Sequence, residues 1–285
     1  MLHRLFKYIF VLVTIAFVYS CGDIDLPVAD QQIVVDAWIE NGEPPIVILT
    51  GTVPNTLETR KYEDLEDYII KYAKVYISDG EREEQLVTIV NSIDSVIYYT
   101  SPSWQIPRFV GEVGKTYDLR IEYSGLTVRA SAQIPEPPVL ENVRAEAVGE
   151  DQYRIHADIV DNPETKDYYK FFIRKNHKWQ WESSHLAIYD DVLMDEGRYS
   201  VLVPNSLGKS LNKYVSTYNI SDTVIVKLCT FSEDIWNYWK DYNDIVAMSR
   251  NPIMPVSKPI RFNVQGGIGY FAGYGKAEKR VILTK

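Results

Sequence analysis

Cysteine and histidine are the residue types with the widest chemistry, and this 285-residue sequence holds two cysteines and four histidines. Zinc is held by clusters of these residues at short spacings, and neither H-E-x-x-H nor a Cys-x-x-Cys pair occurs. The acidic residues between Asp190 and Glu196 lack the spacing of a calcium loop, and no G-x-S-x-G turn presents a serine nucleophile. We predict no catalytic residue, no metal site and no cofactor. A hydrolase without a recognisable motif stays open, because carboxylate pairs of the glycosidase kind are brought together only by the fold.

Cys21 stands where an apolar segment ends. Two basic residues lie among the first seven, and about a dozen apolar residues follow, which predicts a secretory signal peptide over residues 1–20. The sequence around Cys21 resembles the lipobox of bacterial lipoproteins, although the two residues before Ser20 are atypical. We expect Cys21 to become the acylated N-terminus, anchored in a membrane by its acyl chains, with residues 21–30 as a tether. An ordinary signal peptide with an incidental cysteine is the alternative.

Cys229 has no partner for a disulfide if Cys21 is acylated. It lies in the segment DTVIVKLCTF, where Val224, Val226 and Leu228 alternate with the residues between them. Such alternation is typical of a strand. We therefore interpret Cys229 as a half-buried strand residue rather than a catalytic thiol.

Five glycines lie between Gly266 and Gly275, and a glycine-rich loop can bind phosphate through its backbone N–H groups. The dinucleotide fingerprint needs its third glycine three residues after the second, whereas Gly273 comes four residues after Gly269. The surrounding Phe and Tyr residues favour a strand. We predict a tight turn or a bulged strand pair in which backbones approach closely.

The segment from His177 to Gly197 mixes Trp, Tyr, His and acidic residues without regular alternation. Irregular loops on a β-sandwich often carry function, and exposed indole rings stack on sugars or apolar peptide side chains. We predict a ligand-binding surface that includes Trp179, Trp181 and Tyr189. The alternative is that Trp179 and Trp181 share one strand face and point into the core.

The composition bears on both partners and fold. A formal net charge of −9 excludes nonspecific binding to nucleic acid, which needs an excess of Lys and Arg. Aromatic residues make up 13% of the sequence, and their bulk favours half-buried strands over helical bundles. Strand patterns separated by turns recur along the chain, which is typical of a β-sandwich.

The prolines at residues 135, 137 and 138 interrupt these strand patterns. We predict an all-β fold with two β-sandwich domains of the immunoglobulin or fibronectin type III kind, over residues 31–134 and 139–285, joined by a Pro-rich linker at 135–138. One α-helix is expected at 232–250, because Ser232 can cap it and apolar residues follow at helical spacing.

Four stretches, VVDAWIENGEPPIVILT, AKVYISDG, GKTYDLRIEYSG to AQIPEPP, and FNVQGGIGYFAGYG, resemble the domain-of-unknown-function 4249 family of Bacteroidota outer-membrane lipoproteins. The resemblance implies a non-enzymatic accessory or binding component beside a TonB-dependent outer-membrane transporter, and it carries no catalytic residue. Acidic residues soon after Cys21 resemble a signal for export to the cell surface, with the periplasmic face as the alternative. An adhesive or structural immunoglobulin-like surface module is a second interpretation.

Overall fold

The computed structural model describes residues 32–53, 66–92, 96–176, 178, 180–190, 197–206, 217–220, 222–248 and 258–283. This part of the chain consists of three β-sheets, one α-helix and a short 3-10 helix η1 (Glu66–Tyr68), which confirms the predicted all-β class with one helix in the second half. Within it, no helix has the length and apolarity needed to cross a bilayer. The predicted signal peptide, Cys21 and the tether lie outside the described residues.

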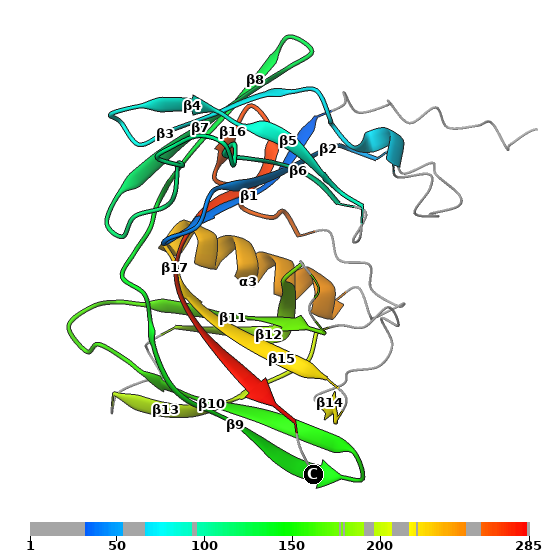
Figure 1. Cartoon of the computed structure of the whole chain (residues 1–285), viewed down its shortest axis with the longest axis vertical. Helices are drawn as coiled ribbons and strands as arrows, with labels where there is room; N and C mark the ends of the chain where they lie inside the picture. The colour runs from blue at the N-terminus through cyan, green and yellow to red at the C-terminus, as the bar shows by residue number, and fades with distance from the viewer. Residues whose placement is uncertain are drawn as a thin grey trace, which may run out of the picture.

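A large central sheet runs the length of the molecule (Figure 1). It has eight strands in the order β12-β11-β15-β17-β1-β2-β6-β5, so strands from both halves of the sequence belong to it. Their bounds are β12 (Glu182–Asp190), β11 (Tyr168–Lys175), β15 (Thr223–Thr230), β17 (Ile268–Ile282), β1 (Ile33–Glu40), β2 (Ile46–Gly51), β6 (Val96–Thr100) and β5 (Val87–Asn91).

Strand β17 joins the two halves of this sheet. Its first part pairs in parallel with β1, from Ile268 opposite Val34 to Tyr274 opposite Glu40. Its second part pairs antiparallel with β15, with Gly275 opposite Thr230. The prediction that residues 139–285 form a separate sandwich is therefore wrong for this strand. The prolines at 135–138 do form an irregular connection between strands, but the end of the chain returns to the first half.

Two smaller sheets cover one face of the central sheet, one in each half. The first has the order β16-β8-β7-β3-β4, and the second has the order β13-β10-β14, with β9 also paired to β10. Alternate residues of β1, such as Val35 and Ala37, are buried in the core between the central and the five-stranded sheet. The bounds are β16 (Val264–Gln265), β8 (Leu126–Gln133), β7 (Thr116–Tyr123), β3 (Lys74–Ser78), β4 (Glu83–Gln85), β13 (Arg198–Val203), β10 (Gln152–Val160), β14 (Tyr218–Asn219) and β9 (Val139–Gly149).

Helix α3 (Glu233–Met248) packs on the opposite face of the central sheet, where the two halves meet (Figure 1). Ile235 and Trp239 are one turn apart and are buried against aromatic residues of β11 and β17, as the helical spacing predicts. The buried carboxylate of Asp241 accepts two hydrogen bonds from the Arg261 guanidinium, at 2.7 and 2.9 Å. These bonds hold the pKa of Asp241 well below its usual range, although burial opposes them. They fix the helix against the segment that leads into β16.

Candidate functional site

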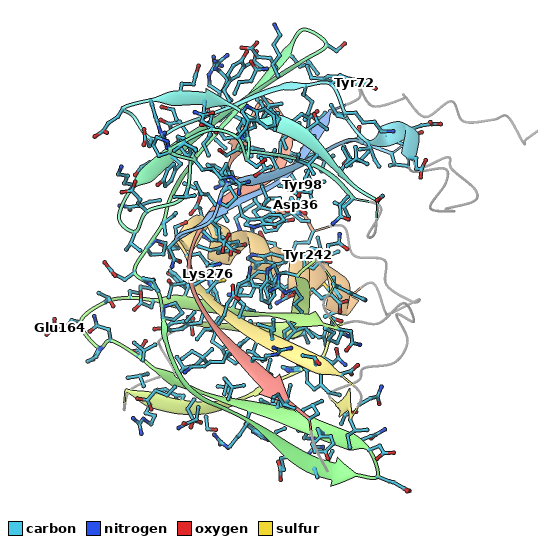
Figure 2. The ribbon with its side chains drawn as sticks, in the orientation of Figure 1. Asp36, Tyr72, Tyr98, Glu164, Tyr242 and Lys276 are labelled. Atoms are coloured by element: carbon cyan, nitrogen blue, oxygen red, sulfur yellow. The ribbon has the colours of Figure 1, made fainter. Side chains whose placement is uncertain are left out.

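A cavity of about 510 Å³ lies on the helix-bearing face of the central sheet, between the two halves. This volume is within the range of small-molecule sites. Figure 2 shows three of its lining residues, Asp36, Tyr98 and Lys276, in the middle of the molecule. Since both halves contribute walls, the cavity exists only because β17 holds them in one sheet.

Strand alternation places the lining side chains. Asp36, Trp38 and Glu40 on β1 line the cavity, while Val35, Ala37 and Ile39 between them point into the core on the other face. The same alternation directs side chains of three other strands toward the cavity. They are Tyr270, Tyr274 and Lys276 on β17, Tyr98 and Thr100 on β6, and Phe172 and Arg174 on β11. A two-residue period thus separates a binding face from a packing face on the same strands.

Aromatic rings form much of the cavity wall. Phe172 makes edge-to-face contacts with Trp239 and with Tyr274, at centroid distances of 5.9 and 5.7 Å. The Trp239 indole N–H donates a hydrogen bond to the Tyr274 hydroxyl at 3.2 Å. Trp38, Tyr98 and Trp181 add further ring surface to the lining. Rings that are held by one another and by hydrogen bonds provide a preformed surface for the apolar face of a ligand.

An ion-paired cluster closes one side of the cavity. The buried carboxylate of Glu40 binds the ammonium of Lys227 directly and lies 3.4 Å from that of Lys276. Lys276 also contacts Glu43 at 2.9 Å and Glu278 at 3.2 Å. Burial opposes the charge on Lys276, but its hydrogen bond to Glu43 and the nearby carboxylates raise its pKa. Each charge of this cluster therefore has an opposite charge beside it.

The other wall holds polar atoms for which the described part of the chain supplies no hydrogen-bond partner. Asp36 Oδ1, Thr100 Oγ1 and Arg108 Nε are buried, and none has a hydrogen-bond partner within the described part of the chain. Burial raises the pKa of Asp36, and the Tyr270 hydroxyl, which hydrogen-bonds to it, acts in the opposite direction. Arg108 donates one hydrogen bond, to the Ser101 carbonyl at 3.1 Å. Neither Arg108 nor Arg174 has a carboxylate within 4.0 Å among the described residues.

Lys170 lies beside the cavity lining and is fully buried. Its ammonium sits 4.2 Å from the ring centroid of Trp239 and 5.4 Å from that of Phe172, and it has no hydrogen-bond partner among the described residues. Burial lowers the pKa of Lys170 to about 7. The Lys170 amine therefore changes its charge near neutral pH. It is not part of the cavity lining.

The structure separates the predicted site residues. Trp181 lines the cavity, with the Arg174 guanidinium 4.4 Å and the Lys227 ammonium 4.2 Å from its ring centroid. Tyr189 packs instead against the core on the other face, edge-to-face with Phe171 at 6.2 Å. Trp179 lies outside the described residues. Of the three predicted residues, Trp181 therefore lines the cavity and Tyr189 does not.

Other sequence predictions concern residues with structural roles. Cys229 is fully buried, more deeply than predicted for this strand residue, and burial raises the pKa of its thiol. Gly269 has a φ of +113°, and a Cβ there would lie 1.9 Å from the Val35 carbonyl oxygen, which confirms the predicted close backbone approach. Across the described ranges, no three His, Cys, Asp or Glu side chains come together in a way that could hold a metal ion.

Sequence reasoning missed most of the cavity. The signal was present in VVDAWIE, where a tryptophan stands between two acids on the face of a strand opposite an apolar face. Such a face is unusual for a solvated strand, which carries polar residues without large rings. The contribution of β11 and β15 to the same cavity depends on the pairing with β17, and no local pattern reports that pairing.

Comparison with known families gives a match over most of the chain. The sequence model of a family described as a domain of unknown function, DUF4249, matches residues 22–280. A search of curated proteins finds no match. The matched range includes every residue that lines the cavity.

Proposed function

The chain belongs to the DUF4249 family, and we propose that it is a non-enzymatic binding protein whose central cavity takes up a small ligand. In this proposal it is a lipoprotein anchored through Cys21 at the outer membrane and exposed on the cell surface. There it serves as an accessory component of a TonB-dependent nutrient-uptake system.

The cavity is the observation that carries the proposal. It has the volume of a small-molecule site, a wall of aromatic rings that contact one another, and a few polar atoms without partners among the described residues. Natural ligand sites combine these features, since apolar surface supplies affinity and a small number of polar groups fix the orientation. The buried charges beside it are paired with each other, so they shape the wall rather than provide a reactive group.

Binding rather than catalysis fits the chemistry of the lining. The buried cysteine is held as a thiol, because burial raises its pKa. Among the lining carboxylates of the described chain, Asp36 is the one with a buried oxygen that lacks a hydrogen-bond partner, and its other interaction is with the Tyr270 hydroxyl. A hydrolase of the two-carboxylate kind needs both acids free of permanent ion pairs.

The anchoring part of the proposal rests on the sequence of the first 25 residues. We expect the native protein to fractionate with outer membranes and to react on intact cells with a membrane-impermeant amine reagent. A purification through a C-terminal tag, after mild solubilisation, should enrich a TonB-dependent transporter.

The matched control is Cys21→Ala, which removes the acylation site and leaves the cavity unchanged. This variant should leave the membrane fraction and lose the transporter. A Cys21→Ala protein that remains in the membrane would overturn the anchor, and an anchored protein without a transporter would overturn the uptake role.

A further inference from the structure

We propose that the ligand of this cavity is a neutral, polyhydroxylated molecule of the saccharide class, hydrogen-bonded by Asp36, Thr100 and Arg108 and stacked on the cavity rings. The inference rests on the proposed function of the cavity as a binding site, and it adds the chemical class of the ligand.

Three of the six buried polar atoms that lack a partner in the described structure belong to residues on one wall of the cavity. Buried polar groups in folded proteins are nearly always hydrogen-bonded, because each unsatisfied group costs free energy. A cluster of such groups at a cavity is explained when a ligand completes their bonds. The terminal torsion of an aspartate is soft, so a small rotation brings either oxygen of Asp36 toward a ligand.

The three groups differ in what they need. The Asp36 carboxylate accepts hydrogen bonds, Arg108 donates them, and the Thr100 hydroxyl does both. Arg108 uses one N–H on the Ser101 carbonyl, which leaves most of its five donors for a ligand. A hydroxyl group also donates and accepts, so a molecule with several hydroxyls can satisfy all three at once.

The charges argue against an ionic ligand. An anion that paired with Arg108 or Arg174 would bring a negative charge into the cavity that Asp36 also lines. A cation that paired with Asp36 would meet the two guanidiniums in the same way. A neutral ligand avoids both repulsions, and the lining as a whole carries no excess formal charge, because its four carboxylates (Asp36, Glu40, Glu43 and Glu278) balance its four cations (Arg108, Arg174, Lys227 and Lys276).

The aromatic rings supply the second half of a saccharide site. Trp38, Tyr98 and Trp181 line the same cavity as the three polar groups. The C–H faces of a sugar ring are apolar and flat enough to lie on such rings, while its hydroxyls point outward at the rim. A peptide is recognised in a different way, through backbone bonds along the edge of a sheet. This cavity lies over the face of a sheet and presents side chains.

The test is a titration of the full chain, purified in a detergent without a sugar headgroup. The probes are neutral trisaccharides of glucose, mannose, xylose and galactose, with tripeptides and an acidic trigalacturonate for comparison. Quenching of tryptophan fluorescence and calorimetry report binding. We expect at least one neutral trisaccharide to bind, and we expect Asp36→Ala and Arg108→Met each to raise its Kd at least tenfold.

Two exposed residues of the same types serve as matched controls. Asp118→Ala on β7 and Arg154→Met on β10 lie outside the cavity and should leave the Kd within twofold. Thermal melting of every variant shows that the fold is retained.

The outcomes separate the two proposals. If a tripeptide or trigalacturonate binds, no neutral trisaccharide does, and Asp36→Ala weakens that binding, the saccharide class is wrong and the cavity remains a binding site. If neither Asp36→Ala nor Arg108→Met changes the Kd for the saccharide, the saccharide binds elsewhere and the proposed site is wrong. If no probe binds, the saccharide class and the support for a binding function are both lost.

Discussion

Two buried lysines on neighbouring strands of the central sheet differ in whether a carboxylate pairs with their charge. Lys170 on β11 and Lys227 on β15 are 0% and 2% exposed, and their ammonium groups lie 5.4 and 5.3 Å from the same Phe172 ring. Lys227 is paired with Glu40, whereas Lys170 has no hydrogen-bond partner among the described residues. The Glu40 carboxylate is the anion that distinguishes the surroundings of Lys227 from those of Lys170 among the described residues.

The carboxylate comes from the other half of the sequence. Glu40 ends β1, and the pairing of β1 with β17 and of β17 with β15 brings it to Lys227. The ion pair is therefore a product of the shared sheet. Lys170 is placed beside the helix instead, where Trp239 offers a ring but no anion. The comparison shows that the counter-charge of a buried lysine here depends on a long-range strand pairing.

The largest effect is expected when the paired lysine loses its carboxylate. Glu40→Gln leaves a buried ammonium on Lys227 without a counter-charge, and removal of one partner of a buried pair costs about 3–5 kcal/mol. Lys227→Met should cost less, because Glu40 keeps Lys276 at 3.4 Å. Urea denaturation of both variants and of the double variant measures the difference. A double variant as unstable as the sum of the two would contradict the pairing.

The unpaired lysine should show the opposite sign. Lys170→Met removes a buried charge for which the described residues supply no counter-ion and keeps the stem of the side chain, so we expect a gain of a few kcal/mol at pH 6. The folded-state pKa of about 7 lies below the unfolded value of 10.5. The unfolded chain therefore binds more protons between these pH values, and the stability of the natural protein rises as pH increases through this window.

Denaturation curves at pH 6 and pH 9 test this sign. The advantage of Lys170→Met should shrink at the higher pH, where Lys170 in the folded protein is already neutral. A constant advantage would mean that Lys170 does not titrate between these pH values in the folded protein. A destabilised variant would mean that the Trp239 ring stabilises the ammonium more than burial penalises it.

Predictability from the sequence followed the range of the interaction. The strands, the helix beginning after Ser232 and the close approach at Gly269 depend on local alternation, capping and glycine conformation, and the structure contains them. The pairing of β17 with β1 joins residues more than two hundred positions apart, and the sequence carried no local sign of it. The cavity depends on that pairing, which is why its lining residues Asp36 and Glu40 were not predicted.

Substitution of Trp181 measures how much an aromatic neighbour of Lys227 contributes to the stability of the fold. The ring is half-buried between two cations, so Trp181→Ala should cost about 1–2 kcal/mol, below the roughly 3–5 kcal/mol of a fully buried ring such as Trp239. The same substitution should weaken ligand binding, because the ring lines the cavity. Chemical denaturation of Trp181→Ala and Trp239→Ala gives the two costs. Equal losses would place Trp181 in the core.

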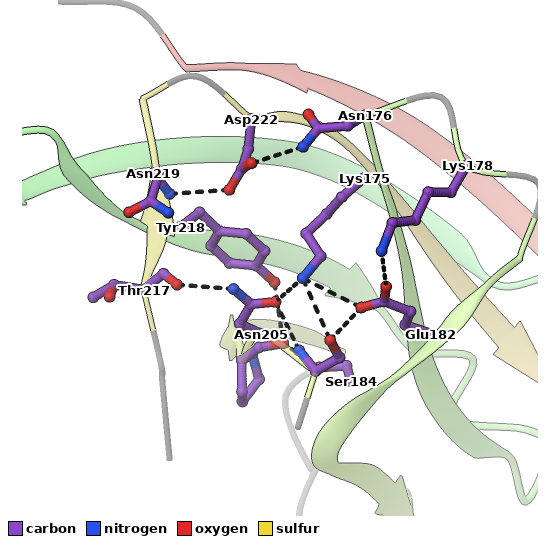
Figure 3. A network of polar contacts seen from close by, with 12 residues as sticks. Lys175, Asn176, Lys178, Glu182, Ser184, Asn205, Thr217, Tyr218, Asn219 and Asp222 are labelled. Atoms are coloured by element: carbon purple, nitrogen blue, oxygen red, sulfur yellow. Dashed lines mark hydrogen bonds and ion pairs between the residues drawn. The ribbon is translucent and has the colours of Figure 1, made fainter. Parts of the chain in front are cut away.

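The smallest effect is expected in another charged cluster, around Glu182, which is partly open to solvent (Figure 3). Lys175 contacts Glu182 at 3.2 Å and donates to Asn205 at 2.8 Å, and Lys178 contacts Glu182 at 3.1 Å. Water competes for these groups, so Glu182→Gln should cost about 1 kcal/mol at neutral pH, much less than the loss of Glu40.

The pH dependence of this cluster should have the same sign as that of Lys170 but should appear in the acid range. Burial opposes the charge of Glu182, but the Ser206 hydroxyl and the two lysines lower its pKa. Its contribution is therefore present above the unfolded pKa and is lost as pH falls through the folded value. Glu182→Gln should flatten the acid side of the stability curve, while Lys170→Met flattens the alkaline side. Glu233→Gln, in the exposed pair with Lys166, is the control and should change neither side. A Glu182→Gln loss as large as that of Glu40→Gln would show that exposure does not decide what a carboxylate contributes in this sheet.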